Sequence, residues 1–214
     1  MKSVLVIGLG RFGSNMVKTL VDLKNEVMAV DISEERVENL LPILTGGQIG
    51  DSTNEHFIKS LGVGNFDLCV VAIGDDFQSS VITTSLLKDY GAKFVLARAS
   101  DEVHAKFLKR NGADRVVFAE KEMAKRLAIK YSSNSIFEYF ELSPEISMWE
   151  IQPPKTWVGK SVIDLDVRRK HNLSVIAIKQ NGQIVAMPGA EHVFDKNETL
   201  ILLGNINDIK KVTD

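Results

Sequence analysis

The segment that most constrains this chain is a short apolar run followed at once by three spaced glycines. Val4–Ile7 has the composition of a buried strand and leads into Gly8-Leu9-Gly10-Arg11-Phe12-Gly13, the pattern Gly-x-Gly-x-x-Gly. In that pattern the first glycine makes a tight turn, the second lets backbone approach a diphosphate, and the third lets the next helix pack closely on the strand. The helix N-terminus adds unpaired amides and partial positive charge. The segment therefore predicts a nucleotide site in a parallel α/β fold.

Asp31 supports the same interpretation. It ends the second predicted strand, about twenty residues beyond Gly10, where a carboxylate can accept hydrogen bonds from a ribose diol. No arginine adjoins it in the sequence, so a 2′-phosphate would meet uncompensated negative charge. An adenine nucleotide with a free ribose is the expected ligand, and an NADP-like ligand is disfavoured.

Arg11 bears on which adenine nucleotide binds. Its guanidinium could donate two hydrogen bonds to the terminal phosphate of ATP or ADP, or it could be a solvent-facing loop residue, and the spacing does not decide between these. The chain has no Walker lysine and no Gly-x-Ser-x-Gly elbow. We therefore expect binding without catalysis, with an NAD-dependent oxidoreductase as the alternative. Four histidines are scattered without metal-ligand spacing and are expected at the surface or packed against helices: His56, His104, His171 and His192.

Apolar runs alternate with helical patterns in the first part of the chain, as in a parallel sheet covered on both faces. The predicted strands are Val4–Ile7, Val27–Val30, Gln48–Ile49, Leu68–Ile73, Phe94–Ala97 and Arg115–Phe118. Ser33 and Asp101 are predicted N-caps, and Ser52 with Glu55 has the spacing of a capping box. Left-handed residues are expected after helices at Gly62, Gly91 and Gly112.

The rest of the chain has a different pattern. A helix is predicted from Glu120, and its apolar stripe of Met123, Leu127 and Tyr131 could cover its own sheet or a second copy. A second helix is predicted at about Ile136–Leu142. A small α+β module follows, with a helix at about Val162–His171, a hairpin turn at Asn181-Gly182 and a short C-terminal helix. Its predicted strands are Met148–Ile151, Ser174–Lys179, Gln183–Met187 and Thr199–Leu203.

Composition excludes several classes of protein. The net charge of −2 over 214 residues gives no basic field for a nucleic acid, so no nucleic-acid partner is expected. The longest apolar runs fall far short of the roughly 18 to 20 residues that span a bilayer. No secretory signal is recognised, which predicts a cytoplasmic protein. The single cysteine, Cys69, is expected to be a buried apolar residue.

Seven stretches together resemble the RCK-type regulatory subunits of bacterial potassium uptake systems, the Ktr and Trk proteins, most closely the KtrA/KtrC branch. They are Val6-Ile7-Gly8-Leu9-Gly10-Arg11-Phe12-Gly13, Ala29-Val30-Asp31-Ile32, Gly50-Asp51-Ser52-Thr53, Val71-Ala72-Ile73-Gly74, Gly112-Ala113-Asp114-Arg115, Glu120-Lys121-Glu122-Met123-Ala124 and Ile163-Asp164-Leu165-Asp166-Val167-Arg168. The resemblance covers nearly the whole chain.

The resemblance implies a Rossmann-type RCK-N domain with its crossover helix at 1–133, a connecting helix at 134–144 and a small α+β RCK-C domain at 145–214. It implies dimers that assemble into an octameric ring on the cytoplasmic face of a potassium-translocating membrane subunit of the KtrB/TrkH type. ATP would favour the active form and ADP the inactive one. NAD(H) stays open as the ligand, because Trk-type relatives use it.

The resemblance also implies the site residues. Arg11 would meet the γ-phosphate of a nucleotide in the neighbouring subunit, and Glu120 would help to hold a divalent cation such as Mg²⁺. The full predicted nucleotide site is Gly8, Gly10, Arg11, Phe12, Gly13, Asp31, Asp51, Ser52, Ala72, Ile73, Gly74, Arg98 and Glu120.

A second site is implied in the C-terminal module, for cyclic di-AMP across a dimer interface. Its residues would be Ile163, Asp166, Arg168, Val175 and Pro188. Ser174 and Arg169 stand where the family pattern has asparagine and alanine. In the alternative interpretation Ile163 and Val175 belong to the core and Arg168 is a surface charge.

Overall fold

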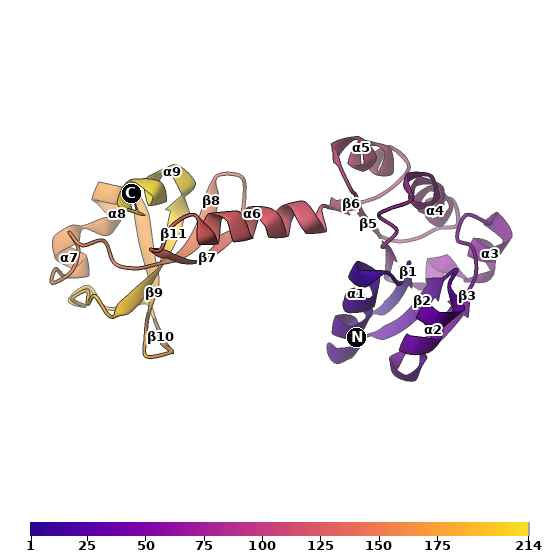
Figure 1. The fold of residues 1–214 in the computed structure, drawn as a ribbon, viewed down its shortest axis with the longest axis horizontal. Helices are drawn as coiled ribbons and strands as arrows, with labels where there is room; N and C mark the ends of the chain where they lie inside the picture. The colour runs from indigo at the N-terminus through magenta and orange to yellow at the C-terminus, as the bar shows by residue number, and fades with distance from the viewer. Residues whose placement is uncertain (214) are drawn as a thin grey trace. The chain divides into compact units, whose positions relative to one another are not determined.

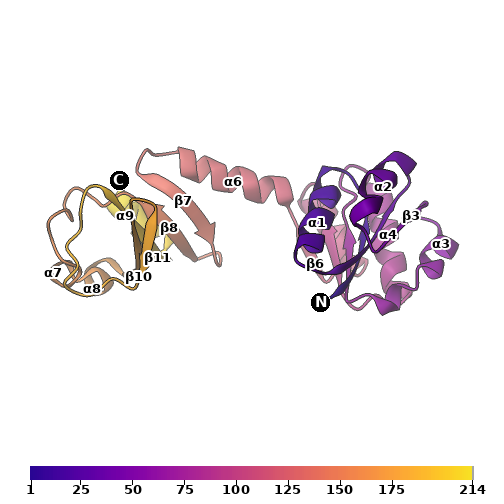
Figure 2. The same ribbon diagram turned by 90° about the horizontal axis from the view of Figure 1, so that it is seen from below.

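The computed structural model describes residues 1–213. They form two compact units, Met1–Lys121 and a second that begins at Glu122 (Figure 1; Figure 2 gives a second view). Helix α6 (Ala119–Tyr131) starts in the first unit and continues into the second.

The first unit is an open parallel sheet of six strands in the order β3-β2-β1-β4-β5-β6. The strands are β1 (Ser3–Ile7), β2 (Glu26–Asp31), β3 (Gly46–Ile49), β4 (Leu68–Val71), β5 (Val95–Arg98) and β6 (Arg115–Val117). The helices between them are α1 (Arg11–Asp22), α2 (Glu34–Leu40), α3 (Glu55–Ser60), α4 (Phe77–Asp89) and α5 (Glu102–Arg110), with 3₁₀ turns at Leu41–Ile43 and Val63–Asn65. The doubly wound α/β prediction is confirmed.

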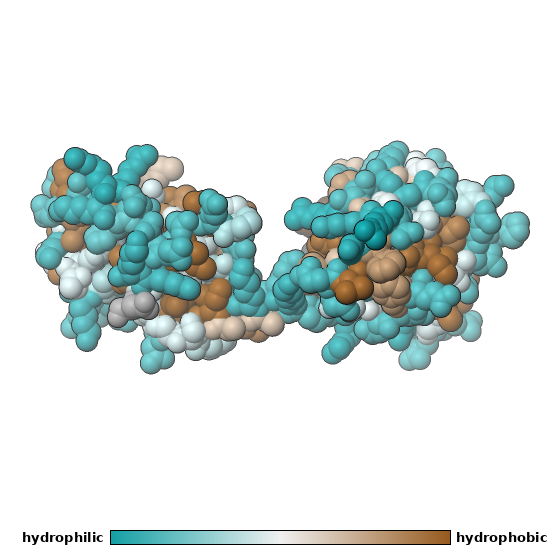
Figure 3. Space-filling model, turned by 90° about the horizontal axis from the view of Figure 1, so that it is seen from above, coloured by the Kyte–Doolittle hydropathy of each residue, from teal (hydrophilic) through white to brown (hydrophobic). Residues whose placement is uncertain are grey.

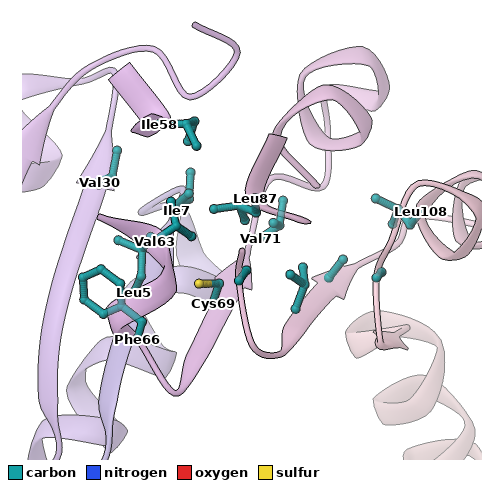
Figure 4. Close-up of a cluster of buried hydrophobic side chains, with 14 of the residues drawn as sticks. Leu5, Ile7, Val30, Ile58, Val63, Phe66, Cys69, Val71, Leu87 and Leu108 are labelled. Carbon is teal, nitrogen blue, oxygen red and sulfur yellow. The ribbon is translucent and has the colours of Figure 1, made fainter. Parts of the chain in front are cut away.

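Both faces of this sheet are buried because alternate strand residues point to opposite sides. Leu5 and Ile7 of β1 pack in a cluster with residues of α3, α4 and α5 (Figure 4). Val4 and Val6 pack in a second cluster with residues of α1 and α2. Cys69 lies in the first cluster as a free, buried thiol, and burial raises its pKa to about 12.

Side-chain caps fix where the helices begin. The Ser33 hydroxyl caps α2 and the Asp101 carboxylate caps α5, as predicted. The predicted capping box at Ser52 is wrong, since Asn54 caps α3 by accepting from the amide of Phe57. Left-handed backbone follows the helices at the three expected glycines, Gly62, Gly91 and Gly112.

The second unit is an antiparallel sheet in the order β10-β9-β11-β8-β7 with short helices. Its elements are β7 (Ile136–Glu141), β8 (Ile146–Ile151), α7 (Val162–Leu165), α8 (Val167–His171), β9 (Leu173–Gln180), β10 (Gln183–Ala186), β11 (Glu198–Asn205) and α9 (Ile206–Thr213). Asn181 and Gly182 join β9 to β10 with positive φ, as the predicted hairpin requires. The predicted helix Val162–His171 is divided at Asp166, which adopts left-handed backbone.

The predicted helix at Ile136–Leu142, and with it the connecting helix at 134–144, is wrong. The segment is strand β7, which pairs antiparallel with β8. The Tyr139 ring packs edge-on against Trp149 at 4.8 Å, and both side chains are almost fully buried. Cross-strand aromatic packing of this kind overrides a local preference for helix.

Apolar side chains remain exposed on α6 and on the surface formed by α4 and α5. The α6 stripe of Met123, Leu127 and Tyr131 is between 45% and 78% exposed. On the first unit, Phe77 of α4 and Phe107 of α5 contact each other at the surface, and apolar side chains gather on the face shown in Figure 3.

His104 of α5 is fully buried between polar partners. Its Nε2 atom lies 2.6 Å from the Ser80 hydroxyl, and Nδ1 lies 3.1 Å from the Ser100 hydroxyl. Burial lowers the pKa of the imidazole below its ordinary value of 6.5. The folded chain therefore holds His104 neutral under conditions in which the unfolded chain is protonated.

We expect the free energy of unfolding of the first unit to fall as pH drops through 6.5, because the unfolded state then binds the extra proton. His104→Gln should remove that part of the pH dependence, whereas His56→Gln, at an exposed position, should keep it. Urea unfolding followed by circular dichroism at several pH values measures this. Tryptophan fluorescence would not, since Trp149 and Trp157 lie in the second unit. Equal pH dependence in the His104→Gln variant and the unaltered chain would contradict the prediction.

Candidate functional site

The glycine turn after β1 is shaped by close backbone packing. Gly8 has φ of +94°, and its amide donates to the carbonyl of Val30, which ties the turn to β2. A Cβ on Gly13 would lie 1.8 Å from the carbonyl oxygen of Gly8, so only glycine allows α1 to approach the turn. A Cβ on Gly10 would meet nothing within 4 Å. The protein does not fill the space beside Gly10, and the cavity described below begins there.

The N-terminus of α1 faces this space without a side-chain cap. Gly10 holds the N-cap position and provides no side-chain acceptor for the first-turn amides. Such amides and the helix dipole favour an anionic ligand. Arg11 is exposed at the same turn, and the structure gives it no ion pair among residues 1–213. The turn therefore offers unpaired donors and one free cation.

Asp31 lies at the end of β2, as predicted, and is only 5% exposed. Its Oδ2 accepts from the amide of Leu9 at 2.6 Å, and its Oδ1 accepts from the amide of Ser33 at 2.8 Å. Arg36 of α2 places a guanidinium nitrogen 3.6 Å from Oδ2. Although no arginine is next to Asp31 in the sequence, the fold places Arg36 beside it, so the expectation of an uncompensated carboxylate is wrong. The argument against a ligand with a 2′-phosphate therefore no longer holds. One turn into a helix capped at Ser33, position 36 could have been placed near Asp31 from the sequence.

The turns after β3 and β4 bring further predicted residues to the same edge of the sheet. Asp51 accepts from the amide and hydroxyl of Thr53, which closes the turn after β3. The buried Ser52 hydroxyl lies 2.8 Å from that of Thr83 in α4. After β4, the amide of Ala72 donates to the carbonyl of Ile7 and so extends the pairing with β1.

Arg98 at the end of β5 places a largely buried positive charge in the site. Its side chain is 15% exposed and donates to Oε1 of Glu120 at 2.6 Å, with Asp75 at 3.9 Å. The guanidinium carbon lies 5.9 Å from the centre of the Phe12 ring and packs on Gly74, where a Cβ would come within 2.6 Å. Its Nε is the single fully buried polar side-chain atom without a partner in the described part of the chain.

These elements enclose a cavity of about 450 Å³ at the carboxyl ends of the parallel strands, where open α/β sheets bind ligands. All predicted nucleotide residues line it except Gly13, which lies behind the turn and allows the close packing. Sequence reasoning missed seven lining residues: Ile7, Ile32, Arg36, Gly50, Asp75, Asp76 and Ser79. Asp76 caps α4, and hydrogen bonds from Ser79 lower the pKa of its carboxyl.

The cavity wall is rich in acid as well as base. Five carboxylates and three arginines line it: Asp31, Asp51, Asp75, Asp76, Glu120, Arg11, Arg36 and Arg98. No group of three or more histidine, cysteine, aspartate or glutamate side chains within residues 1–213 is arranged to hold a metal ion. Glu120, the predicted metal ligand, pairs with Arg98, and its role in binding a cation stays a prediction. A divalent cation here would need oxygen ligands supplied by a bound phosphate.

The residues predicted for cyclic di-AMP lie in the second unit, around the loop after β10. The amide of Ile163 donates to the carbonyl of Ala190 at 2.9 Å, so α7 holds the loop that contains Pro188. Arg168 is exposed on α8, Val175 packs partly against the core, and Asp166 pairs with Arg169 at 3.6 Å. Their role in binding stays a prediction.

Comparison with known proteins places the chain in a family. The TrkA-N domain model matches residues 4–119 and the TrkA-C domain model matches residues 148–214. Ktr system potassium uptake protein C of Bacillus subtilis is 40% identical over 210 residues, which cover 98% of this chain and 95% of that protein. The chain belongs to the family of Ktr potassium uptake proteins. Within this family, Ktr system potassium uptake protein A is 38% identical in B. subtilis, over 98% of this chain and 95% of that protein, and 30% identical in Vibrio alginolyticus, over 95% and 92%.

Solved structures confirm the fold. The GsuK channel bound to NAD matches all of this chain and 39% of the channel chain, with a TM-score of 0.71 and 16% identity. The GsuK RCK domain matches 99% of this chain and 47% of that chain with a TM-score of 0.69 and 16% identity. Within the described residues, no helix has the length and apolar character needed to cross a bilayer.

Gly10 and Gly13, the second and third glycines of the pattern, give a matched pair of substitutions. Gly13→Ala should lower the free energy of unfolding by about 1–3 kcal/mol, because the added methyl group must push α1 away from the Gly8 carbonyl. Gly10→Ala should cost less than about 1 kcal/mol, since its methyl group meets open space. Urea unfolding followed by circular dichroism measures both. Equal loss of stability in the two variants would show that the turn is not packed as described.

Proposed function

We propose that this chain is the regulatory subunit of a potassium uptake system and that the adenine nucleotide in its Rossmann cavity sets the activity of a membrane partner. The observation that carries the proposal is the cavity itself, which gathers twelve of the thirteen predicted nucleotide residues at one edge of the sheet. Similarity to Ktr proteins over 98% of the chain supports the potassium transport role. The subunit binds its ligand and catalyses no reaction.

The ligand that suits this cavity best is ATP or ADP. The glycine turn and the free α1 terminus would hold phosphates, and Asp31 would accept from the ribose. Because five carboxylates and only three arginines line the cavity, its net negative charge would repel a triphosphate that carries no cation. A divalent cation such as Mg²⁺, held by Glu120 together with phosphate oxygens, would offset this repulsion. NAD(H) is the alternative ligand.

The terminal phosphate is the feature that a regulatory subunit must detect. A ligand shifts a conformational equilibrium only through different affinities for the two states. Arg11 is unpaired at the turn and would meet the terminal phosphate of a nucleotide in a neighbouring copy. Glu120 lies in the first turn of α6. Loss of its ion pair with Arg98 would therefore free the start of the helix that leads into the second unit.

The subunit would act as an assembly. The exposed α6 stripe, Met123, Leu127 and Tyr131, is proposed to pair two copies, and the Phe77–Phe107 surface would join dimers into an octameric ring. Residues 1–133 would be the nucleotide-binding domain, and residues from 145 onward the domain that binds cyclic di-AMP. The ring would sit on the cytoplasmic face of a KtrB/TrkH-like potassium-translocating subunit.

A titration of the full chain with ATP, ADP and NADH tests the ligand assignment. ATP and ADP should bind more tightly than NADH and should give assemblies that differ in light scattering. Arg11→Ala should weaken ATP binding at least tenfold, because a charge-assisted contact to the terminal phosphate is lost. Lys18→Ala, on the exposed face of α1 away from the cavity, is the matched control. Tighter binding of NADH than ATP, with no effect of Arg11→Ala, would overturn the proposal.

The cation role of Glu120 has a separate test. Mg²⁺ should strengthen ATP binding by the unaltered chain, and Glu120→Gln should remove most of that dependence, since an amide oxygen is a weaker ligand than a carboxylate. Glu102→Gln serves as the control, because Glu102 is 73% exposed, pairs with Lys121 and does not line the cavity. An unchanged Mg²⁺ dependence in Glu120→Gln would remove Glu120 from the cation site.

A further inference from the structure

A second cavity lies wholly within the second unit, remote in sequence from the nucleotide site. Its volume is about 900 Å³, within the range of small-molecule sites. Its residues come from the start of β7, the loop after β8, the end of α8, the loop before β11 and the end of α9. None of the residues predicted for cyclic di-AMP lines it.

The charge of this cavity has one sign. None of the described residues that line it is acidic. Three lysines and one histidine line it: Lys155, Lys196, Lys211 and His171. Lys211 pairs with Asp208 at 2.8 Å, but Lys155 and Lys196 form no ion pair within residues 1–213. We call this cavity the lysine pocket. Within residues 1–213 no carboxylate lines the pocket beside Lys155 and Lys196, and this excess of positive charge favours an anionic occupant.

Trp157 adds an unpaired donor to the lysine pocket. The residue is 3% exposed, and its ring is packed 5.8 Å from Phe194 and 5.1 Å from the His171 ring. Trp149, the other tryptophan, donates its indole N–H to Ser147 at 2.7 Å. The Trp157 indole N–H has no acceptor within residues 1–213, and because it is not among the fully buried unpaired atoms, it is accessible to solvent. The His171 imidazole likewise makes no hydrogen bond there.

The wall around Trp157 is held by backbone hydrogen bonds. The amide of Trp157 donates to the carbonyl of Pro154 at 2.8 Å, and the amide of Gly159 donates to that of Phe194 at 2.9 Å. Pro153 and Pro154 further restrict this loop. The loop is thus fixed before any ligand arrives, which reduces the entropy cost of binding.

We propose that the lysine pocket binds a small polyanion, a metabolite carrying phosphate or carboxylate groups. Lys155 and Lys196 would pair with its charges, and the N–H groups of Trp157 and His171 would donate to its oxygens. No described residue of the pocket offers a carboxylate ligand for a cation, so the anion would bind without a metal ion. This inference does not rest on the nucleotide proposal.

Binding can be followed on the full chain labelled with 5-fluorotryptophan, which gives one ¹⁹F resonance for each of the two tryptophans. Inorganic pyrophosphate and citrate are the probes for phosphate and carboxylate chemistry. Either probe should shift the Trp157 resonance and leave the Trp149 resonance in place, and its affinity should fall as salt is raised. Binding of one probe and not the other would identify the group that the pocket selects.

The double variant Lys155→Ala, Lys196→Ala should weaken binding at least tenfold while the fold is kept, since both side chains are exposed. Lys160→Ala, an exposed lysine outside the pocket, should bind as the unaltered chain does. Arg11→Ala and Arg168→Ala should also leave the Trp157 shift intact, which separates this pocket from the two nucleotide sites. Absence of a Trp157 shift with millimolar probe, or equal affinity in the double variant and Lys160→Ala, would overturn the proposal.

Discussion

The cavity of the first unit exists because β1 and β4 are neighbours in the sheet while their connections run to opposite sides. From β1 the chain crosses to β2 and β3, and from β4 it crosses to β5 and β6. Side chains and turns at this switch point are drawn apart and leave a crevice. The backbone ladder continues past the strands, since Gly8 donates to Val30 and Ala72 donates to Ile7. These two hydrogen bonds tie the crevice floor to the strands of the sheet.

Arg98 is the residue whose environment depends most on what occupies that crevice. A guanidinium that is largely removed from water is stabilised only if anions and acceptors replace the lost hydration. Glu120 provides one such partner, and the buried Nε has none. A phosphate in the cavity would compete with Glu120 for the same guanidinium. Glycine at position 74 lets the guanidinium of Arg98 lie against the backbone, because a Cβ there would come within 2.6 Å of it and the guanidinium would have to shift.

The sequence was sufficient to predict the six strands of the first unit, mainly because strands of a parallel sheet buried on both faces form short continuous apolar runs. Strand β3, Gly-Gly-Gln-Ile with no fully buried residue, is the exception. The sequence was also sufficient for the glycine turn and Asp31. It failed where partners distant in sequence decide the outcome. Ser52 had the spacing of a cap, but its hydroxyl is engaged by Thr83 of α4, and Asn54 caps the helix instead.

The errors in the second unit have the same cause. Residues 136–142 carry no strong alternation, and only pairing with β8 and the contact between Tyr139 and Trp149 make them a strand. Arg36 is five residues from Asp31 in the sequence, and only the turn into α2 brings its guanidinium to within 3.6 Å of the carboxylate. Asp75 and Asp76 were missed because they follow β4 in a loop whose path the pattern does not give.

The two cavities differ in a way that follows from their charges. The first mixes five carboxylates with three arginines, so a triphosphate there would be repelled unless a cation accompanied it. The lysine pocket has bases and no described acid, so an anion binds it directly and competes with ordinary salt. A subunit with both would read a metal–nucleotide complex in one unit and a free anion in the other.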